Sequence, residues 1–213
     1  MSVSAKICGL STPGAVRAAL DGGAAYLGFM FFAASPRNIG VEAAARLAEP
    51  VRGRVKIVAV TVDPSDVELD RIATGLRPDF IQLHGKETPA RVREAAARAG
   101  AGAIKVIPVS GASDIDAADA YETVVEHLMF EPRPPKDASR PGGLGTPLDW
   151  SLMAGRRFQR PWFLAGGLDP WNLAEAVRQS GARMVDVSSG VERGPGLKDP
   201  ALITAFLDAA RKA

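Results

Sequence analysis

Eight short apolar runs alternate with eight helical patterns along the 213 residues, and this alternation predicts an α/β protein, a single-domain (βα)8 TIM barrel. Strict alternation indicates parallel strands joined by crossover helices, and eight such units close into a barrel rather than an open sheet. No Gly/Ser-rich linker or shift in composition divides the chain. We therefore expect residues 1–213 to form one domain.

The strands are predicted where apolar and β-branched residues gather between turn signals. The first ends at Cys8, where Gly9 breaks the extended pattern. In order, the predicted strands are residues 4–8, 26–31, 56–62, 79–84, 103–107, 127–131, 162–165 and 184–188.

The helices are predicted from Ala- and Leu-rich periodicity and from their capping residues. Thr12 or Ser11 opens the first helix ahead of Pro13, and Asp199 opens the last. In order, the predicted helices are residues 12–22, 41–49, 65–74, 88–99, 113–120 and 150–154, one that starts after residue 170, and one from 199 to the last residue.

The composition excludes several classes of function. With 26 basic and 24 acidic residues the net charge is only +2, so we expect no nucleic-acid partner. No run of about 18 apolar residues is present, so we expect no membrane span. A single cysteine excludes an internal disulfide and a cysteine-clustered zinc site, and two histidines argue against a multi-histidine metal site.

The same features predict a cytoplasmic location. One cysteine suits a reducing compartment. The N-terminus has no basic segment followed by a long apolar run, so we expect no signal peptide.

The chemistry is expected where the strands end, because active groups in such barrels come from strand C-termini and the loops after them. One thiol, one guanidinium and two carboxylates would then line a single mouth, as an acid/base site with an anion clamp. The side chains placed there are Cys8, Arg37, Gln82, His84, Glu131, Asp186 and Ser188.

Several of these residues allow two interpretations. Cys8 shares a strand face with Lys6, so it is either a thiolate activated by a nearby ammonium group or a buried residue that packs as a small hydrophobe. Arg37 is either an anion-binding group or a solvated loop charge. His84 either contacts a substrate or is structural, whereas His127, at the start of its strand, is interpreted as structural.

Two glycine-rich turns, at residues 164–168 and 187–192, follow the last two strands. Glycine lets backbone N–H groups approach an anion closely, and these two loops commonly bind phosphate in barrels of this type. The sequence therefore predicts a phosphorylated small molecule as the ligand.

Six short motifs are spread in order along nearly the whole chain. They are KICG at 6–9, LGF at 27–29 with SPR at 35–37, QLHG at 82–85, GGLG at 142–145 with DW at 149–150, LAGGL at 164–168, and DVSSGVE at 186–192. Together they resemble the motifs of the phosphoribosylanthranilate isomerase family of tryptophan biosynthesis.

The resemblance implies an Amadori rearrangement of N-(5-phosphoribosyl)anthranilate to 1-(2-carboxyphenylamino)-1-deoxyribulose 5-phosphate, with no metal or organic cofactor. It implies that Cys8 is the general base, that Arg37 pairs with the anthranilate carboxylate, and that Asp186 orients the sugar or the amine. The phosphate-binding residues that it implies are Gly166, Gly167, Ser189 and Gly190.

The general acid is where this sequence departs from the family pattern. The family has Asp at the end of the sixth strand, and this chain has Glu131, with Leu144 at a position where the family commonly has a polar residue. We expect Glu131 to serve as the acid, although one extra methylene changes its reach. The alternatives are a phosphate-ligand-binding barrel with weakened or lost catalysis, or another sugar-phosphate isomerase or epimerase.

Two further expectations concern the loop after the sixth strand and the assembly. Residues 133–140 are interpreted either as a lid over the site or as a solvated Pro-rich crossing. The oligomeric state is left open between a monomer and a homodimer.

Overall fold

The computed structural model describes residues 3–134 and 148–213, and in them eight parallel strands close into a barrel in chain order, β1-β2-β3-β4-β5-β6-β7-β8. The barrel closes where β8 pairs with β1, with Lys6 opposite Asp186. The strands are β1 (Ser4–Cys8), β2 (Tyr26–Phe31), β3 (Lys56–Thr61), β4 (Phe80–Leu83), β5 (Gly102–Val109), β6 (His127–Pro132), β7 (Trp162–Leu164) and β8 (Met184–Val187). The predicted fold class is confirmed.

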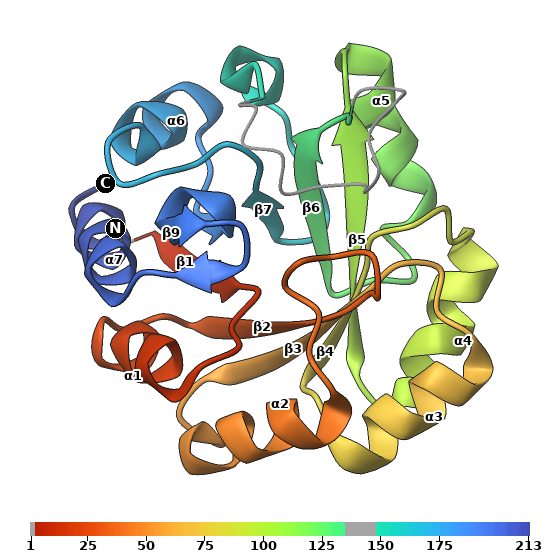
Figure 1. Cartoon of the computed structure of the whole chain (residues 1–213). Helices are drawn as coiled ribbons and strands as arrows, with labels where there is room; N and C mark the ends of the chain where they lie inside the picture. The colour runs from red at the N-terminus through yellow and green to blue at the C-terminus, as the bar shows by residue number, and fades with distance from the viewer. Residues whose placement is uncertain (1–2, 135–147) are drawn as a thin grey trace.

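Helices surround the barrel as an outer ring (Figure 1). The α-helices are α1 (Pro13–Asp21), α2 (Val41–Ala48), α3 (Asp66–Gly75), α4 (Pro89–Ala99), α5 (Ala112–Asp116), α6 (Leu173–Ser180) and α7 (Pro200–Lys212). Short 3-10 turns lie at η1 (Glu49–Val51), η2 (Ala117–Ala120), η3 (Trp150–Met153) and η4 (Ser189–Val191). None of the helices in the described ranges is both long and apolar enough to cross a membrane.

The helix starts follow from short polar side chains that satisfy unpaired backbone N–H groups. Thr12, rather than Ser11, caps α1 by accepting from the Ala15 N–H, and Pro13 follows at the first position. Asp199 accepts from the backbone of Ala201 and Leu202 at the start of α7, as the sequence predicts.

The structure differs from the sequence-based prediction in a few elements. Strand β5 runs two residues further than expected, to Val109, and the short helix near Trp150 is a single 3-10 turn. The sequence analysis missed a small antiparallel hairpin after β8, made of β9 (Glu192–Gly194) and β10 (Leu197–Lys198). Strands of three and two residues carry too little alternation to be recognised from hydrophobic pattern.

The apolar core has two parts, as expected for a filled barrel inside a ring of helices. A large cluster packs the outer faces of the strands against the helices. A smaller cluster fills the barrel interior, and its buried members are Cys8, Val58, Val60, Ile104, Val106, Met129, Phe163 and Ala165.

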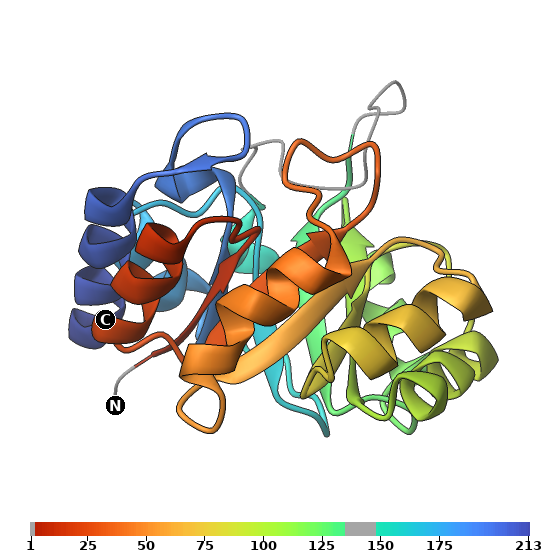
Figure 2. The same ribbon diagram turned by 60° about the horizontal axis from the view of Figure 1, so that its bottom comes forward.

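The two ends of the barrel are built differently. At the end where the strands begin, the rings of Tyr26, Phe80, His127 and Phe163 pack with centroids 5.1–5.9 Å apart. At the other end, the loop after β2 and the blue β9–β10 hairpin rise on the same side, opposite the N-terminus (Figure 2). The β2 loop and the β9–β10 hairpin therefore both stand over the mouth at which the strands end.

Residues 135–147 lie outside the described residues. They contain most of the loop expected to be a lid, 133–140, and the GGLG motif with Leu144.

Candidate active site

A cavity lies at the mouth where the strands end, and it gathers residues from β1, β2, β4, β6 and β8 and from the loops after β2, β3, β4, β7 and β8. Of the site residues predicted from the sequence, all but Gly190 line it. Its lining is Cys8, Met30, Phe32, Ser35, Arg37, Val62, Gln82, His84, Glu131, Gly166, Gly167, Leu168, Asp186, Val187, Ser188 and Ser189.

Cys8 lies beside a buried ion pair. Lys6, which is fully buried, donates from Nζ to Asp186 Oδ1 at 2.7 Å. A methyl group placed on Gly28 would lie 3.1 Å from Lys6 Nζ and 3.2 Å from Cys8 Sγ, so the ammonium and the sulfur flank the same bare backbone. Glycine at this position leaves room for both groups at the cavity wall.

Burial and the neighbouring positive charges act in opposite directions on the pKa of the Cys8 thiol. Burial raises the pKa of the Cys8 thiol above its ordinary value; Asp186 adds to the rise, and the nearby ammonium groups of Lys6 and Lys198 only partly offset it. Burial by itself lowers the pKa of Lys6, but the charges of Asp186 and Cys8 outweigh that effect and raise it. Lys6 is therefore a permanent cation next to the thiol.

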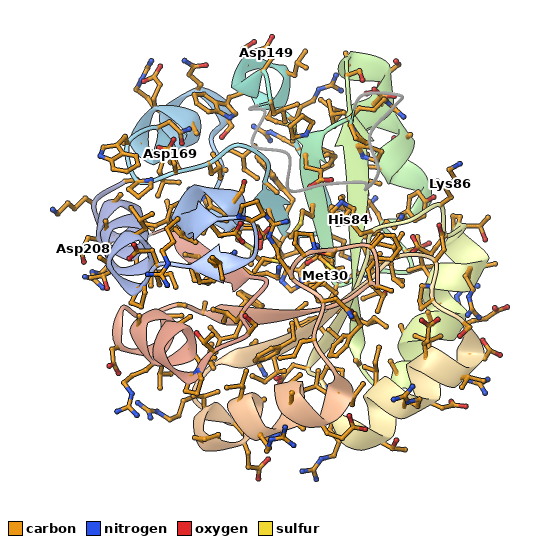
Figure 3. All side chains as sticks on the ribbon, in the orientation of Figure 1. Met30, His84, Lys86, Asp149, Asp169 and Asp208 are labelled. Carbon is orange, nitrogen blue, oxygen red and sulfur yellow. The ribbon has the colours of Figure 1, made fainter. Side chains whose placement is uncertain are left out.

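Glu131 and His84 meet on the opposite side of the cavity. His84 Nε2 and Glu131 Oε1 form a hydrogen bond, and their side chains are 11% and 8% exposed. In Figure 3 the labelled His84 lies inside the ring of helices, near Met30, whereas Lys86 and Asp149 lie at the rim. The carboxyl group predicted to be the acid is thus hydrogen-bonded to His84, for which the sequence left a substrate contact open.

Arg37 is held by the hairpin that the sequence analysis missed. Its Nε and Nη2 donate to the two carboxylate oxygens of Glu192 at 2.7 and 2.8 Å, and both side chains are 4% exposed. Lys198 Nζ donates to Glu192 Oε1 at 2.6 Å and to the Ser188 carbonyl at 2.8 Å. One side of the Arg37 fork is therefore occupied by Glu192, and among residues 3–134 and 148–213 no hydrogen-bond partner is found for Nη1.

The three charges of this cluster influence one another. Burial by itself raises the pKa of Glu192, but hydrogen bonds from Arg37 and the charge of Lys198 lower it below its ordinary value. Burial lowers the pKa of Lys198 in spite of Glu192 beside it. Gly9 makes room for this arrangement, because a Cβ there would lie 2.7 Å from Arg37 Cδ and the Gly9 φ is +76°.

The two glycine-rich turns lie next to each other at the same mouth. Gly166 and Gly167 have φ of +84° and +66°, and a Cβ on Gly166 would lie 2.0 Å from Pro132 Cδ, so only glycine fits there. Ser189 lines the cavity, but Gly190 packs against the Leu168 backbone, where a Cβ would lie 1.9 Å from the carbonyl oxygen. Gly190 thus brings the two turns together rather than lining the cavity.

The sequence predicts Gln82 at this mouth without giving it a role, whereas Glu192 and Lys198 were not predicted as members of the site. Gln82 shares a strand face with His84 and lines the cavity, and its Oε1 is buried with no hydrogen-bond partner among the described residues. Glu192 is the last residue of the DVSSGVE motif, but its partner Arg37 lies 155 residues away in the sequence. Lys198 carries no local signal, because only the hairpin brings it to Glu192.

Metal binding finds no support in the described part of the chain. Within residues 3–134 and 148–213, no three His, Cys, Asp or Glu side chains come together in a group that could hold a metal ion. The groups that the cavity does present are a thiol, carboxylates, cations and bare backbone, which suit proton transfer and anion binding.

Comparison with protein families and curated proteins gives one consistent result. The family model described as N-(5'phosphoribosyl)anthranilate (PRA) isomerase matches residues 5–209. The N-(5'-phosphoribosyl)anthranilate isomerase of Caulobacter vibrioides is 64% identical over 217 residues, which cover 100% of this chain and 99% of that protein. The protein of the same name from Parvibaculum lavamentivorans is 51% identical, with 100% of both chains covered.

Solved structures agree with the family match. Phosphoribosyl anthranilate isomerase from Thermotoga maritima has a TM-score of 0.87 and 32% identity, covering 99% of this chain and 100% of that one. A phosphoribosyl anthranilate isomerase in complex with reduced 1-(o-carboxyphenylamino)-1-deoxyribulose 5-phosphate has a TM-score of 0.85 and 30% identity, with the same coverage.

Proposed function

The chain belongs to the N-(5'-phosphoribosyl)anthranilate isomerase family of tryptophan biosynthesis, and from that premise we propose that Cys8 and Glu131 are the base and acid of its isomerisation. One observation carries the assignment: the Cys8 sulfur, from β1, and the Glu131 carboxyl group, from β6, line the same cavity. A substrate held there has a proton donor and a proton acceptor within one site.

The chemistry follows from these two groups. Glu131 donates its proton to the furanose ring oxygen of N-(5'-phosphoribosyl)anthranilate, the C1–O bond breaks, and the nitrogen lone pair forms a protonated Schiff base. The Cys8 thiolate then removes the proton from C2, and that electron pair forms the enolamine. The enol proton leaves as C1 gains one, which gives the ketose with no net change in oxidation state. No cofactor is needed for these transfers.

The remaining roles concern binding. The Arg37 Nη1 side, left free by Glu192, is proposed to receive the anthranilate carboxylate. Gly166, Gly167 and Ser189 are proposed to hold the phosphate, and Gly190 supports them by its packing. Asp186 is proposed to act at the sugar or amine while it holds Lys6 next to Cys8.

We propose that residues 1–213 act as one cytoplasmic domain, as a monomer or a homodimer. One similar structure, from Thermotoga maritima, is described as monomers generated from a dimeric isomerase. Light scattering on the purified chain distinguishes the two states by mass.

The test is a turnover assay on the purified chain that follows the loss of N-(5'-phosphoribosyl)anthranilate by its fluorescence. We expect turnover by the wild type, no turnover by Cys8→Ala, and a kcat lowered at least about a hundredfold in Glu131→Gln, with melting temperatures of both variants that match the wild type. Wild-type protein that binds the reduced product analogue without turning over the substrate would instead identify a binding barrel with lost catalysis.

Glu131→Asp tests whether the longer acid is a handicap. A large gain in kcat would show that Glu131 is a poorly placed acid, an unchanged kcat would show that the site tolerates either length, and a reduced kcat would show that the site suits the longer side chain.

A further inference from the structure

We propose that His84 is a positioning residue for Glu131, rather than the direct substrate contact or the purely structural residue between which the sequence left the choice open. Its imidazole fixes one oxygen of the Glu131 carboxyl group, so that the other oxygen faces the substrate. The inference rests on the proposed role of Glu131 as the acid, and it explains how this chain uses glutamate where the family pattern has aspartate.

The contact itself is the first support. Of the side chains that the structure describes, Glu131 hydrogen-bonds only to His84, through Oε1, and Oε2 is left without a partner from residues 3–134 or 148–213. The two groups come from β6 and from the end of β4, which are separated by β5. A bond that spans an intervening strand holds the carboxyl group over the cavity rather than against its own backbone.

The extra methylene gives such a bond more freedom to restrain than a shorter acid would. Glutamate has one more side-chain torsion than aspartate, and an unrestrained side chain of this length has up to about 2 kcal/mol of rotamer entropy. A displacement of about 1 Å in a catalytic group can cost on the order of a hundredfold in rate. The hydrogen bond from His84 to one Glu131 oxygen therefore restrains the longer side chain, as the shorter side chain of aspartate is restrained by having one torsion fewer.

His84 is itself braced by a buried ion pair that the proposed chemistry does not use. Lys105 and Glu87, with side chains 4% and 1% exposed, pair at 2.7 Å. Lys105 Nζ also donates to the carbonyls of Leu83 at 3.3 Å and Gly85 at 2.8 Å. These are the residues on either side of His84.

Glu87 completes the brace from the other direction. It accepts from the Gly85 N–H at 3.0 Å and from the Asp63 N–H at 2.9 Å. The His84 N–H donates to the Thr61 carbonyl at 2.9 Å. The backbone around His84 is therefore tied to β3 and to the loop after it, and the imidazole is presented from a rigid support.

The decisive experiment is a double-mutant cycle on kcat, measured by loss of substrate fluorescence, for wild type, His84→Ala, Glu131→Asp and the double variant. We expect His84→Ala to lower kcat about 10- to 100-fold with KM changed by less than about threefold, because it acts through the acid. In the Glu131→Asp background the same replacement should lower kcat by less than about threefold, because the shorter carboxyl group no longer depends on His84.

The conservative replacement His84→Gln is the matched control. Its amide can reach Glu131 and hydrogen-bond it, so we expect most of the lost kcat to return. The melting temperatures of all variants are measured as well. If His84→Ala does not fold, the double-mutant cycle is measured with His84→Gln in its place.

Two outcomes overturn the inference. An equal loss of kcat on His84→Ala in the wild-type and Glu131→Asp backgrounds would show that His84 does not act through the acid. A raised KM with unchanged kcat would identify the direct substrate contact instead. Failure of the proposed function is distinguishable from both, because wild-type turnover would then be absent before any replacement is made.

Discussion

The two histidines of the chain lie at opposite ends of one barrel and have opposite surroundings. His127, where β6 begins, packs among the rings of Tyr26, Phe80 and Phe163. His84, where β4 ends, bonds to the Glu131 carboxyl group in the cavity. The strand scaffold is the same at both ends, so the difference comes from the side chains that each end presents.

The aromatic end, where the strands begin, consists of packed side chains. Burial lowers the pKa of His127, and its Nδ1 has no hydrogen-bond partner among the described residues. The open end instead collects charges that burial makes costly, such as Lys6 and Asp186, Lys198 and Glu192. The aromatic end, where the strands begin, therefore contributes mainly to stability, and the charged end, where the strands end, presents the groups suited to chemistry.

The strongest test of this division compares one replacement at each end. Glu131→Gln removes the proton donor and should lower kcat about 10²- to 10⁴-fold. His127→Gln at the aromatic end should leave kcat within about threefold of wild type, because no group there reaches the substrate. Steady-state kinetics on both variants decides the matter, and a comparable loss at His127 would break the comparison.

The aromatic end should dominate stability. Phe163 is fully buried against Tyr26 and His127, and Phe163→Ala should lower the free energy of unfolding by about 3–5 kcal/mol through lost burial and a cavity. Urea unfolding measures the loss. Turnover of the remaining folded protein should stay near wild type at low temperature; a collapse of kcat in folded protein would tie the aromatic end to chemistry.

The state of Cys8 can be read by alkylation, because it is the single cysteine of the chain. Burial raises the pKa of this thiol, so near neutral pH it is mostly protonated in the free enzyme. The rate of reaction with iodoacetamide should rise about tenfold per pH unit through pH 7–9 without levelling off, since only the thiolate reacts. A plateau already below pH 8 would show that Lys6 lowers the pKa more than burial raises it.

Gln82 should behave in the opposite way from Phe163. Its buried Oε1 has no partner among the described residues, so Gln82→Leu removes an unsatisfied acceptor and should leave stability unchanged or raise it by about 1 kcal/mol. Because the side chain lines the cavity, kcat/KM should fall about tenfold. A variant that is both less stable and fully active would place Gln82 with the packing residues.

The smallest expected effect concerns acid stability. His127 has a lowered pKa in the folded protein, so the unfolded chain binds a proton first as the pH falls below about 6.5. Folding stability should therefore decline as the pH falls below about 6.5, and part of that decline should vanish in His127→Phe. Melting temperatures across this range, taken as differences from wild type, measure the effect; identical slopes would show that His127 titrates alike in both states.

The sequence by itself determined the features of this protein that depend on neighbouring residues, which are the strands, the helices and their order. The alternation of apolar runs and capped helices predicts the barrel, because hydrophobic period and caps act over a few residues. The rule that strand ends share one mouth then places Cys8, Arg37, His84, Glu131 and Asp186 together, as the cavity shows. These predictions need only the order of the elements.

Only the tertiary structure decided which side chains are partners. Glu192 binds Arg37 across 155 positions, Lys6 binds Asp186 across 180, and His84 bonds to Glu131 across an intervening strand. Pairings at such distances depend on the register and closure of the barrel, which no local pattern encodes. Hydrogen bonds act over about 3 Å in space, so residues far apart in sequence can choose their partners only once the barrel has closed.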